Sequence, residues 1–215
     1  MDLTNVTFKM LVVEAYELTD DRVTGGPGWI KSDSFDVVAE AAPASTIDGL
    51  RKMLLMLLAD RFKLVIHHEE KVMPAYVLLV GKKGTKLQPA ADPNGKFQCK
   101  PGEGVKEQIH LVCLNATMAN LGDLVTRLTG GAGGYVDAPV VDMTEIKGAY
   151  DVQLDWMSRG SYNTAMAKSD NGSDTDPLAV SMFDCVEKLG LKLESRKHSL
   201  DTIVIDSVER VPAAN

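Results

Sequence analysis

The chain has 215 residues, 45% of them hydrophobic and 25% charged, which is the composition of a folded globular protein rather than a disordered one. Its formal net charge of -7 and its pI near 5.1 disfavour non-specific binding to nucleic acid or to anionic membranes, because both need a cationic surface. The longest apolar run, LLMLLA, is too short to cross a bilayer, so no membrane span is expected.

Two helices are predicted in the first half of the chain. Apolar residues at helical spacing predict a helix over residues 7–16 with Thr7 as N-cap, so the chain is expected to start directly at this helix. A second helix is predicted over residues 46–61 with Ser45 as N-cap. Its apolar stripe is expected to consist of Ile47, Leu50, Leu54, Leu57 and Leu58.

Strand patterns follow these helices. Residues 35–41 alternate in the manner of a strand, and residues 62–70 and 75–81 predict the two strands of a hairpin. Residues 81–114 predict a surface excursion in which KFQC and IHLVCL form short paired strands. The second half then predicts a helix over 118–128, the strands APVVDM and AYDVQLDW, a polar loop over 157–176, a helix over 178–189, and the strands LKLESR and TIVIDSVER.

The three cysteines are too few for a disulfide framework and have no zinc-site spacing. Cys99 and Cys113 bracket the short predicted hairpin, so they are candidates either for a disulfide or for free thiols. Cys185 lies in a helical pattern and is expected to be a buried apolar residue.

The two halves of the sequence repeat one order of elements, namely helix, connection, strand, helix and hairpin. Asn5-Val6-Thr7 matches Asn115-Ala116-Thr117, Phe35-Asp36-Val37 matches Tyr150-Asp151-Val152, and Lys63-Leu64 matches Lys192-Leu193. We therefore predict an internally duplicated α+β fold in which each half packs two helices on a small antiparallel sheet. The expected domains are a first repeat at 1–80, a connecting excursion at 81–114, and a second repeat at 115–215 with an inserted acidic loop at about 157–176.

The strings NVTFKMLVVEAY, GGPGWIKSDSFDVVAEA, LLADRFKLVIHHEEKVMPAYVLLVGKKGTKL, PVVDMTEIKGAYDVQLDW and LGLKLESRKHSLDTIVIDSVERV resemble a family of uncharacterised bacterial proteins abundant in acidobacteria. The resemblance implies a domain of unknown function that is usually exported to the periplasm or secreted. Some members are joined to membrane zinc peptidases of the beta-lactam-sensor type. The repeat is also similar to the short N-terminal domains of secretins and TonB-dependent receptors, which are periplasmic interaction modules.

Members of that family usually carry a signal peptide and a strand before the first helix. The segment MDLTNVTF has neither the cationic nor the apolar region of a secretory signal, so no signal peptide is expected in the sequence as given. A missing first strand would leave an open sheet edge, and homodimerisation through that edge is an expectation of the sequence.

The glycine-rich stretch GGPGW follows a predicted helix and precedes a strand, which is the wrong order for a phosphate-binding loop. A turn that seats Trp29 is the favoured interpretation, and Trp29 is kept as a candidate ligand-binding residue. Asp36 and Asp151 are further candidate ligand-binding residues because the duplication makes them equivalent, although both are expected to be exposed.

The cluster His67-His68-Glu69-Glu70 holds the densest set of potential ligands, and a solvated strand end is its favoured interpretation. On a strand only one histidine and one carboxylate share a face, so a metal site would need His110 or His198 as well. For catalysis, His67, Glu69 and His198 are the candidates. No serine motif of an acyl-transfer enzyme is present.

The loop SDNGSDTDP offers Asp170, Asp174 and Asp176 as oxygen donors for calcium, although a flexible acidic linker is the favoured interpretation. No cofactor is predicted, and calcium is the candidate if one binds. The sequence favours an exported module that binds a protein or a small ligand of the cell envelope. The alternatives are a small-ester or lactone hydrolase assisted by calcium, and a small-molecule sensor that uses a crevice between the halves.

Overall fold

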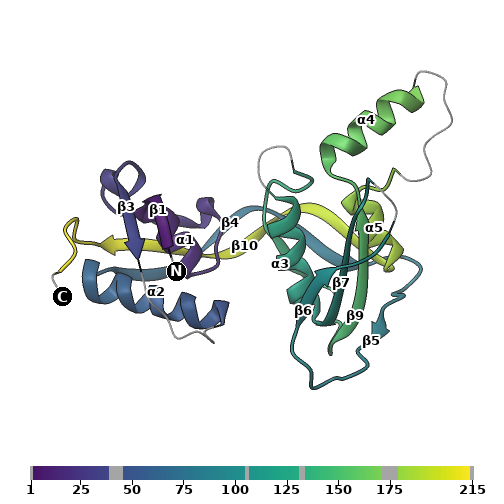
Figure 1. Ribbon diagram of the computed structural model, residues 1–215, viewed down its shortest axis with the longest axis horizontal. Coiled ribbons are helices and arrows are strands. Elements are labelled where there is room, and N and C mark those ends of the chain that lie inside the picture. The colour runs from purple at the N-terminus through teal and green to yellow at the C-terminus, as the bar shows by residue number, and fades with distance from the viewer. Residues whose placement is uncertain (1, 39–45, 105–106, 131–133, 171–178, 214–215) are drawn as a thin grey trace. The chain divides into compact units, whose positions relative to one another are not determined.

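The computed structural model describes residues 2–38, 46–104, 107–130, 134–170 and 179–213, and its helices and strands are labelled in Figure 1. The chain divides into two compact units, of which unit 1 comprises Met1–Met73 and His198–Asn215 and unit 2 comprises Pro74–Lys197. Helices and several sheets give the mixed α+β architecture that the sequence predicts.

Unit 1 begins with a strand, where the sequence predicted that the chain starts at a helix. Its elements are β1 (Asp2–Thr7), α1 (Phe8–Ala15), β2 (Val23–Gly25), β3 (Ser34–Val38) and α2 (Ile47–Phe62), with single 3-10 turns at Asp20–Arg22 and Gly28–Lys31. β1 pairs antiparallel with β3. A strand therefore precedes the first helix, contrary to the prediction, and homodimerisation through a sheet edge stays a prediction.

The two helices of unit 1 begin at threonine N-caps. The hydroxyl of Thr7 accepts a hydrogen bond from the backbone N–H of Met10, as the sequence predicts for this position. The N-cap of α2 is Thr46 rather than Ser45, and its hydroxyl accepts from the backbone N–H of Gly49. Ile47 was predicted to lie on the apolar stripe of this helix, but it is 63% exposed at the first turn of α2.

Aromatic rings form much of the core of unit 1. Phe8 is fully buried and meets Trp29, Phe35 and Phe62 edge-on, with ring centroids 5.0–6.5 Å apart. Such edge-to-face contacts add to the hydrophobic stabilisation that burial itself supplies. Leu54 and Leu58 of α2 complete this core from the apolar stripe of the helix.

Unit 2 contains a second set of elements in the order strand, helix, strand, strand, helix. These are β7 (Ile109–Ala116), α3 (Met118–Thr129), β8 (Val140–Asp142), β9 (Tyr150–Trp156) and α5 (Met182–Lys188), to which the unit adds β5 (Gln88–Pro89), β6 (Gln98–Pro101) and α4 (Arg159–Asp170). β5, β9, β7 and β6 form one sheet in that order. Both α3 and α5 contribute to the core of the unit, the first through Leu121 and Val125 and the second through Cys185 and Val186.

Helix α4 occupies residues for which the sequence predicted a polar loop. Ser158 starts it, because its carbonyl accepts from the N–H of Tyr162 and its hydroxyl accepts from the N–H of Ser161. The next helix, α5, is shorter than predicted and begins only at Met182, where Ser181 and Asp184 form a capping box.

Two long strands replace the two hairpins that the sequence predicted at 62–81 and 191–210. β4 (Val65–Val80) and β10 (Leu191–Ser207) are neighbours in a sheet and lie side by side in Figure 1. The segment Lys71–Pro74 has no glycine or asparagine for a tight turn, and a residue before proline favours an extended backbone. β4 passes from unit 1 into unit 2 at Pro74, and β10 passes back at His198.

The glycine-rich stretch begins in β2 and lies against the end of β10. β2 runs parallel to β10, with Gly25 opposite Ile205. Gly25 has a φ of +74°, and a Cβ atom there would lie 2.6 Å from the carbonyl oxygen of Ile205. The stretch is thus a turn that fits closely against a strand and places Trp29 in the core, in line with the interpretation favoured from the sequence.

Candidate ligand-binding pocket

A concavity of about 410 Å³ lies within unit 2. Its walls are lined by Tyr76, Tyr135, Asp137, Arg159, Tyr162, Asn163, Ser181 and Phe183. Four of these side chains are aromatic, and two carry opposite charges. Aromatic walls with a few polar groups are the usual composition of a small-molecule site.

Four separate segments bring the aromatic rings together. Tyr76 comes from β4, Tyr135 from the segment between α3 and β8, Tyr162 from α4 and Phe183 from α5. The ring of Tyr135 lies edge-on to Tyr162 and to Phe183, each with a centroid distance of 6.2 Å, and Tyr76 meets Phe183 at 6.0 Å. Phe183 and Tyr135 therefore form the centre of one continuous aromatic wall.

Hydrogen bonds hold two of the tyrosines in place. The phenol of Tyr135 donates to the carbonyl of Met157 at 3.0 Å, and its backbone N–H donates to the carbonyl of Thr129 at 2.7 Å. The backbone N–H of Tyr76 donates to the carbonyl of Pro139 at 2.8 Å. Tyr135 is only 7% exposed, so it forms part of the floor of the pocket rather than of its rim.

The charged groups of the pocket are Asp137 and Arg159. Burial raises the pKa of Tyr76, and the negative charge of Asp137 and its hydrogen bond to the phenol raise that pKa further. The guanidinium of Arg159 acts in the opposite direction on the pKa of Tyr76, and it donates to the carbonyl of Gly134. Burial, followed by the neighbouring Tyr162, raises the pKa of Tyr135 to about 12. Both phenols are therefore neutral hydrogen-bonding groups at physiological pH.

This arrangement suits reversible binding of a small ligand that has an apolar face and polar substituents. The apolar face would pack against the rings of Tyr135 and Phe183, while Asp137 accepts hydrogen bonds and Arg159 donates them. A binding site of this kind needs no activated nucleophile.

None of these pocket residues was predicted from the sequence as a site. Arg159 and Tyr162 were missed because the sequence predicted a polar loop over 157–176. Without a predicted helix, nothing indicated that these side chains face a common site. A signal was present in the serine at 158, which is a good N-cap, followed by residues compatible with a helix.

The candidate catalytic histidine His67 lies in a part of β4 where its side chain is exposed. Its Nδ1 is 2.8 Å from Asp206, and the Nδ1 of its neighbour His68 is 2.9 Å from Asp201. The backbone carbonyl of Glu69 accepts from the hydroxyl of Thr202. The structure pairs His67 with Asp206 and not with Glu69 or His198, which is half-buried on β10.

His110, the other histidine considered as a ligand, belongs to a different pair. Its Nδ1 lies 2.6 Å from Asp155 on the adjoining strand β9, and its side chain is 10% exposed. Among the residues that the structure describes, no three histidine, cysteine, aspartate or glutamate side chains gather as they would around a metal ion.

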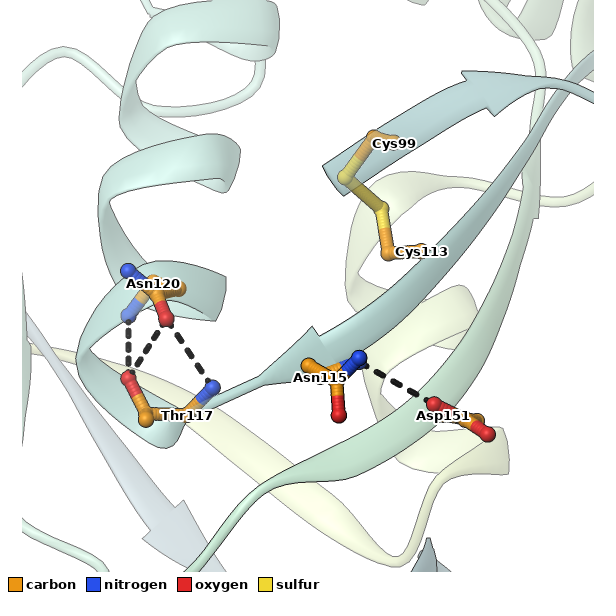
Figure 2. The surroundings of a disulfide bond; sticks show 6 residues. All are labelled: Cys99, Cys113, Asn115, Thr117, Asn120 and Asp151. Carbon is orange, nitrogen blue, oxygen red and sulfur yellow. Dashed lines mark hydrogen bonds between the residues drawn. A yellow bond between two sulfur atoms is a disulfide. The ribbon is translucent and has the colours of Figure 1, made fainter. Parts of the chain in front are cut away.

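The candidate residues Asp36 and Asp151 bind backbone rather than facing a pocket. Figure 2 shows the backbone N–H of Asn115 donating to Asp151, at a distance of 3.0 Å. In unit 1 the backbone N–H of Asn5 donates to Asp36 at 2.8 Å in the same way. Both asparagines have positive φ, 56° and 58°, and each lies where the register of its strand pair shifts. The two aspartates therefore stabilise irregularities in the sheets.

A disulfide joins Cys99 and Cys113, which lie opposite each other on β6 and β7 (Figure 2). The sequence left this pairing open. The remaining cysteine, Cys185, is buried, as expected. The disulfide closes a loop within unit 2 beside the contact of Asn115 with Asp151.

The remaining candidate residues from the sequence are not among those that line the aromatic pocket. Trp29 is half-buried in the aromatic core of unit 1, with its ring centroid 5.5 Å from that of Phe8. Asp174 and Asp176 lie outside the described residues, and Asp170 is the last residue of α4, with a side chain that is not described. The calcium hypothesis therefore stays a prediction.

No helix in the described part of the chain combines the length and apolar character that crossing a membrane requires. No curated protein and no solved structure matches the chain. The model of one family, described as a protein of unknown function (DUF3738), matches residues 9–208. Because this match covers most of the sequence, the chain belongs to the DUF3738 family.

Proposed function

We propose that the chain is an exported ligand-binding module of the bacterial cell envelope that holds a small amphipathic molecule in the pocket of unit 2. The observation that carries this proposal is the aromatic wall of Tyr76, Tyr135, Tyr162 and Phe183, with Asp137 and Arg159 beside it. A ligand would gain from burial against the rings and would be oriented by the two charged groups.

The disulfide between Cys99 and Cys113 supports the exported location. Disulfides persist in oxidising compartments such as the periplasm and are rare where cytosolic reductants keep thiols reduced. The resemblance to exported bacterial proteins leads to the same compartment.

We further propose that the two units arose by internal duplication. Each contains the order strand, helix, strand, strand, helix, and each has an asparagine of positive φ bound to an aspartate on the adjoining strand. In each unit the short strand after the first helix runs parallel to a long strand, β2 to β10 and β8 to β4. The pocket uses α4, which has no counterpart among the described elements of unit 1, so ligand binding would belong to the second copy alone.

The alternative, a hydrolase of small esters or lactones, has the pairs of His67 with Asp206 and His68 with Asp201 in its favour. A histidine oriented by a carboxylate can act as a general base. However, the hydroxyl of Ser199 on the adjacent strand donates to Glu70 and not to an imidazole. The binding module is therefore the better supported proposal.

Thermal unfolding in the presence of small ligands tests the binding proposal. A panel of mono- and disaccharides, dipeptides and aromatic carboxylates would be screened for a rise in Tm, since a ligand at about 100 times its Kd stabilises by about 2.7 kcal/mol. The rise should be lost in Tyr162→Ala and Arg159→Gln, but retained in Tyr150→Phe, whose phenol bonds to Lys147 outside the pocket. A shift that survives both pocket substitutions would place the ligand elsewhere.

A second panel, of hydrolysable substrates, separates binding from hydrolysis. Chromogenic esters and lactones would be assayed with wild type, with His67→Ala, and with EDTA present. Turnover that disappears in His67→Ala or in EDTA would favour the hydrolase and count against a purely binding function.

A further inference from the structure

A second concavity of unit 2, separate from the aromatic pocket, is lined by lysines. It has a volume of about 390 Å³ and includes Lys82, Lys83, Lys86 and Lys192 among its walls, with Glu187 as the carboxylate. The chain as a whole has a formal net charge of -7, so a hollow with this excess of cations differs in sign from the average surface. Three of the lysines belong to the single short segment GKKGTK at residues 81–86.

Backbone contacts give this segment a fixed shape. The N–H of Gly84 donates to the carbonyl of Gly81 at 2.9 Å, which closes the turn. The N–H of Gly81 donates to Gly190 at 2.8 Å, and that of Lys86 donates to Leu189 at 2.9 Å, which fastens the turn to the connection between α5 and β10. Lys82 and Lys83 at the tip and Lys86 at the base are thereby held on a defined backbone.

Close approach of glycines makes this contact possible. Gly84 and Gly190 have φ values of +75° and +77°, and a Cβ atom on Gly190 would lie 2.8 Å from the Cα of Thr85. Any side chain at position 190 would therefore push the turn away and open the hollow. The other side of the contact is also a glycine. A Cβ atom on Gly81 would lie 3.0 Å from the carbonyl oxygen of Gly190.

Three of the four lysines in this hollow have no ion-pair partner among the residues that the structure describes. Lys192 forms an ion pair with Glu194 at 2.8 Å. Within the described part of the chain, no carboxylate lies within ion-pair distance of Lys82, Lys83 or Lys86, and all three side chains are exposed. Three lysines within one six-residue segment concentrate positive charge at this hollow, and a bound anion would offset that charge.

We propose that this hollow binds a phosphorylated ligand that carries two or more phosphate groups. Lysine binds phosphate oxygens as a compact charge with rotatable donors, whereas the fork of arginine binds both carboxylates and phosphates in a bidentate manner. No arginine lines this hollow. The phosphates could belong to a free soluble molecule or to the headgroups of anionic phospholipids, and the two sources share the same chemistry of recognition.

Tripolyphosphate and lipid vesicles are the probes that distinguish these sources. Binding of tripolyphosphate would be measured by calorimetry, with an affinity expected to fall as NaCl rises from about 0.05 M to about 0.3 M. Co-flotation would be measured with phosphatidylcholine vesicles that either contain or lack phosphatidylglycerol. Tripolyphosphate binding supports a soluble ligand, and flotation only with phosphatidylglycerol supports a lipid headgroup.

Variants that remove equal charge test whether the lysines of the hollow are the ones that bind the phosphate probes. The triple variant Lys82→Gln, Lys83→Gln, Lys86→Gln should weaken binding about tenfold or more. The control triple variant Lys96→Gln, Lys100→Gln, Lys147→Gln removes the same charge from exposed positions of unit 2 outside the hollow and should change binding less than about twofold. Glu187→Gln should strengthen binding, because it removes the carboxylate that lines the hollow.

The proposal is overturned if neither probe binds, or if the two triple variants lose affinity equally, which would indicate attraction by net charge alone. Circular dichroism and Tm would show that the variants remain folded. Because these lysines line a different concavity, failure here leaves the aromatic pocket untouched, and failure of the pocket leaves this hollow untouched.

Discussion

The carboxylate of Asp151 binds the backbone N–H of Asn115 at 3.0 Å, at the residue where β7 departs from regular pairing with β9. The second oxygen of the same carboxylate accepts from the backbone N–H of Ala91, also at 3.0 Å. One side chain thus satisfies two backbone donors that no strand partner reaches.

We expect Asp151→Ala to lower the free energy of unfolding by about 1.5–3 kcal/mol, because hydrogen bonds to a charged acceptor are worth this much and two donors lose their partner. Urea unfolding monitored by circular dichroism would measure it. Asp60→Ala, an exposed position on α2, is the control and should stay within about 0.5 kcal/mol of wild type. Equal effects of the two substitutions would show that Asp151 does not stabilise the irregular pairing of β7 with β9 at Asn115.

Gly25 and Gly28 allow a matched test of the glycine-rich stretch. Gly25→Ala should destabilise by about 2 kcal/mol or more, since it combines a positive φ with a Cβ atom 2.6 Å from the carbonyl of Ile205. Gly28→Ala should be tolerated, because nothing lies within 4 Å of its Cβ position. Thermal unfolding of both variants would compare them. If Gly28→Ala were the more damaging, the turn would not be shaped by the pairing of β2 with β10.

Local patterns predicted α1, α2, α3 and α5 better than the long strands, although they missed α4. Thr7 before Phe8, Leu11 and Val12 marks an N-cap and an apolar stripe, and this information is contained in a few neighbouring residues. The continuity of β4 through Lys71–Pro74 depends instead on partners distant in the sequence. Polar residues in the middle of a long strand give the same pattern as a turn, so the sequence alone suggested hairpins.

The pocket could not be predicted for a related reason. Its aromatic residues come from β4, α4, α5 and the segment before β8, and nothing in their spacing along the chain indicates that they meet. The sequence predicted that Asp36 and Asp151 are equivalent, but it could not show that each binds a backbone N–H. A repeated residue pattern predicts which positions correspond, whereas the contacts at those positions depend on the folded chain.

Reduction of the disulfide between Cys99 and Cys113 should lower the stability of unit 2. The two cysteines are separated by 14 positions, and opening a loop of this size costs about 3 kcal/mol in the chain-entropy account. Thermal unfolding with and without a thiol reductant would measure the loss, with reduction confirmed by mass spectrometry. The double variant Cys99→Ala, Cys113→Ala should be insensitive to the reductant. An unchanged Tm of the reduced wild type would contradict the expectation.

The thiol of Cys185 should make stability depend on pH in the alkaline range. Burial raises its pKa from 9.0 to about 11 in the folded chain, so the thiol keeps its proton there after the unfolded chain has lost it. Between these pH values the unfolded state binds fewer protons, and the free energy of unfolding therefore falls as pH rises, by up to about 3 kcal/mol.

Other groups titrate in the same range, so the comparison of wild type with Cys185→Ala isolates this contribution. The substitution creates a small cavity and lowers stability at pH 7, but the difference between the two proteins should shrink as the pH rises from about 9 to about 11. Urea unfolding at several pH values would measure the difference. In the native wild type the thiol should also resist alkylation at about pH 8 and react only after unfolding. Two results together would contradict this expectation. They are fast alkylation of the native protein and a stability difference between wild type and Cys185→Ala that does not change with pH.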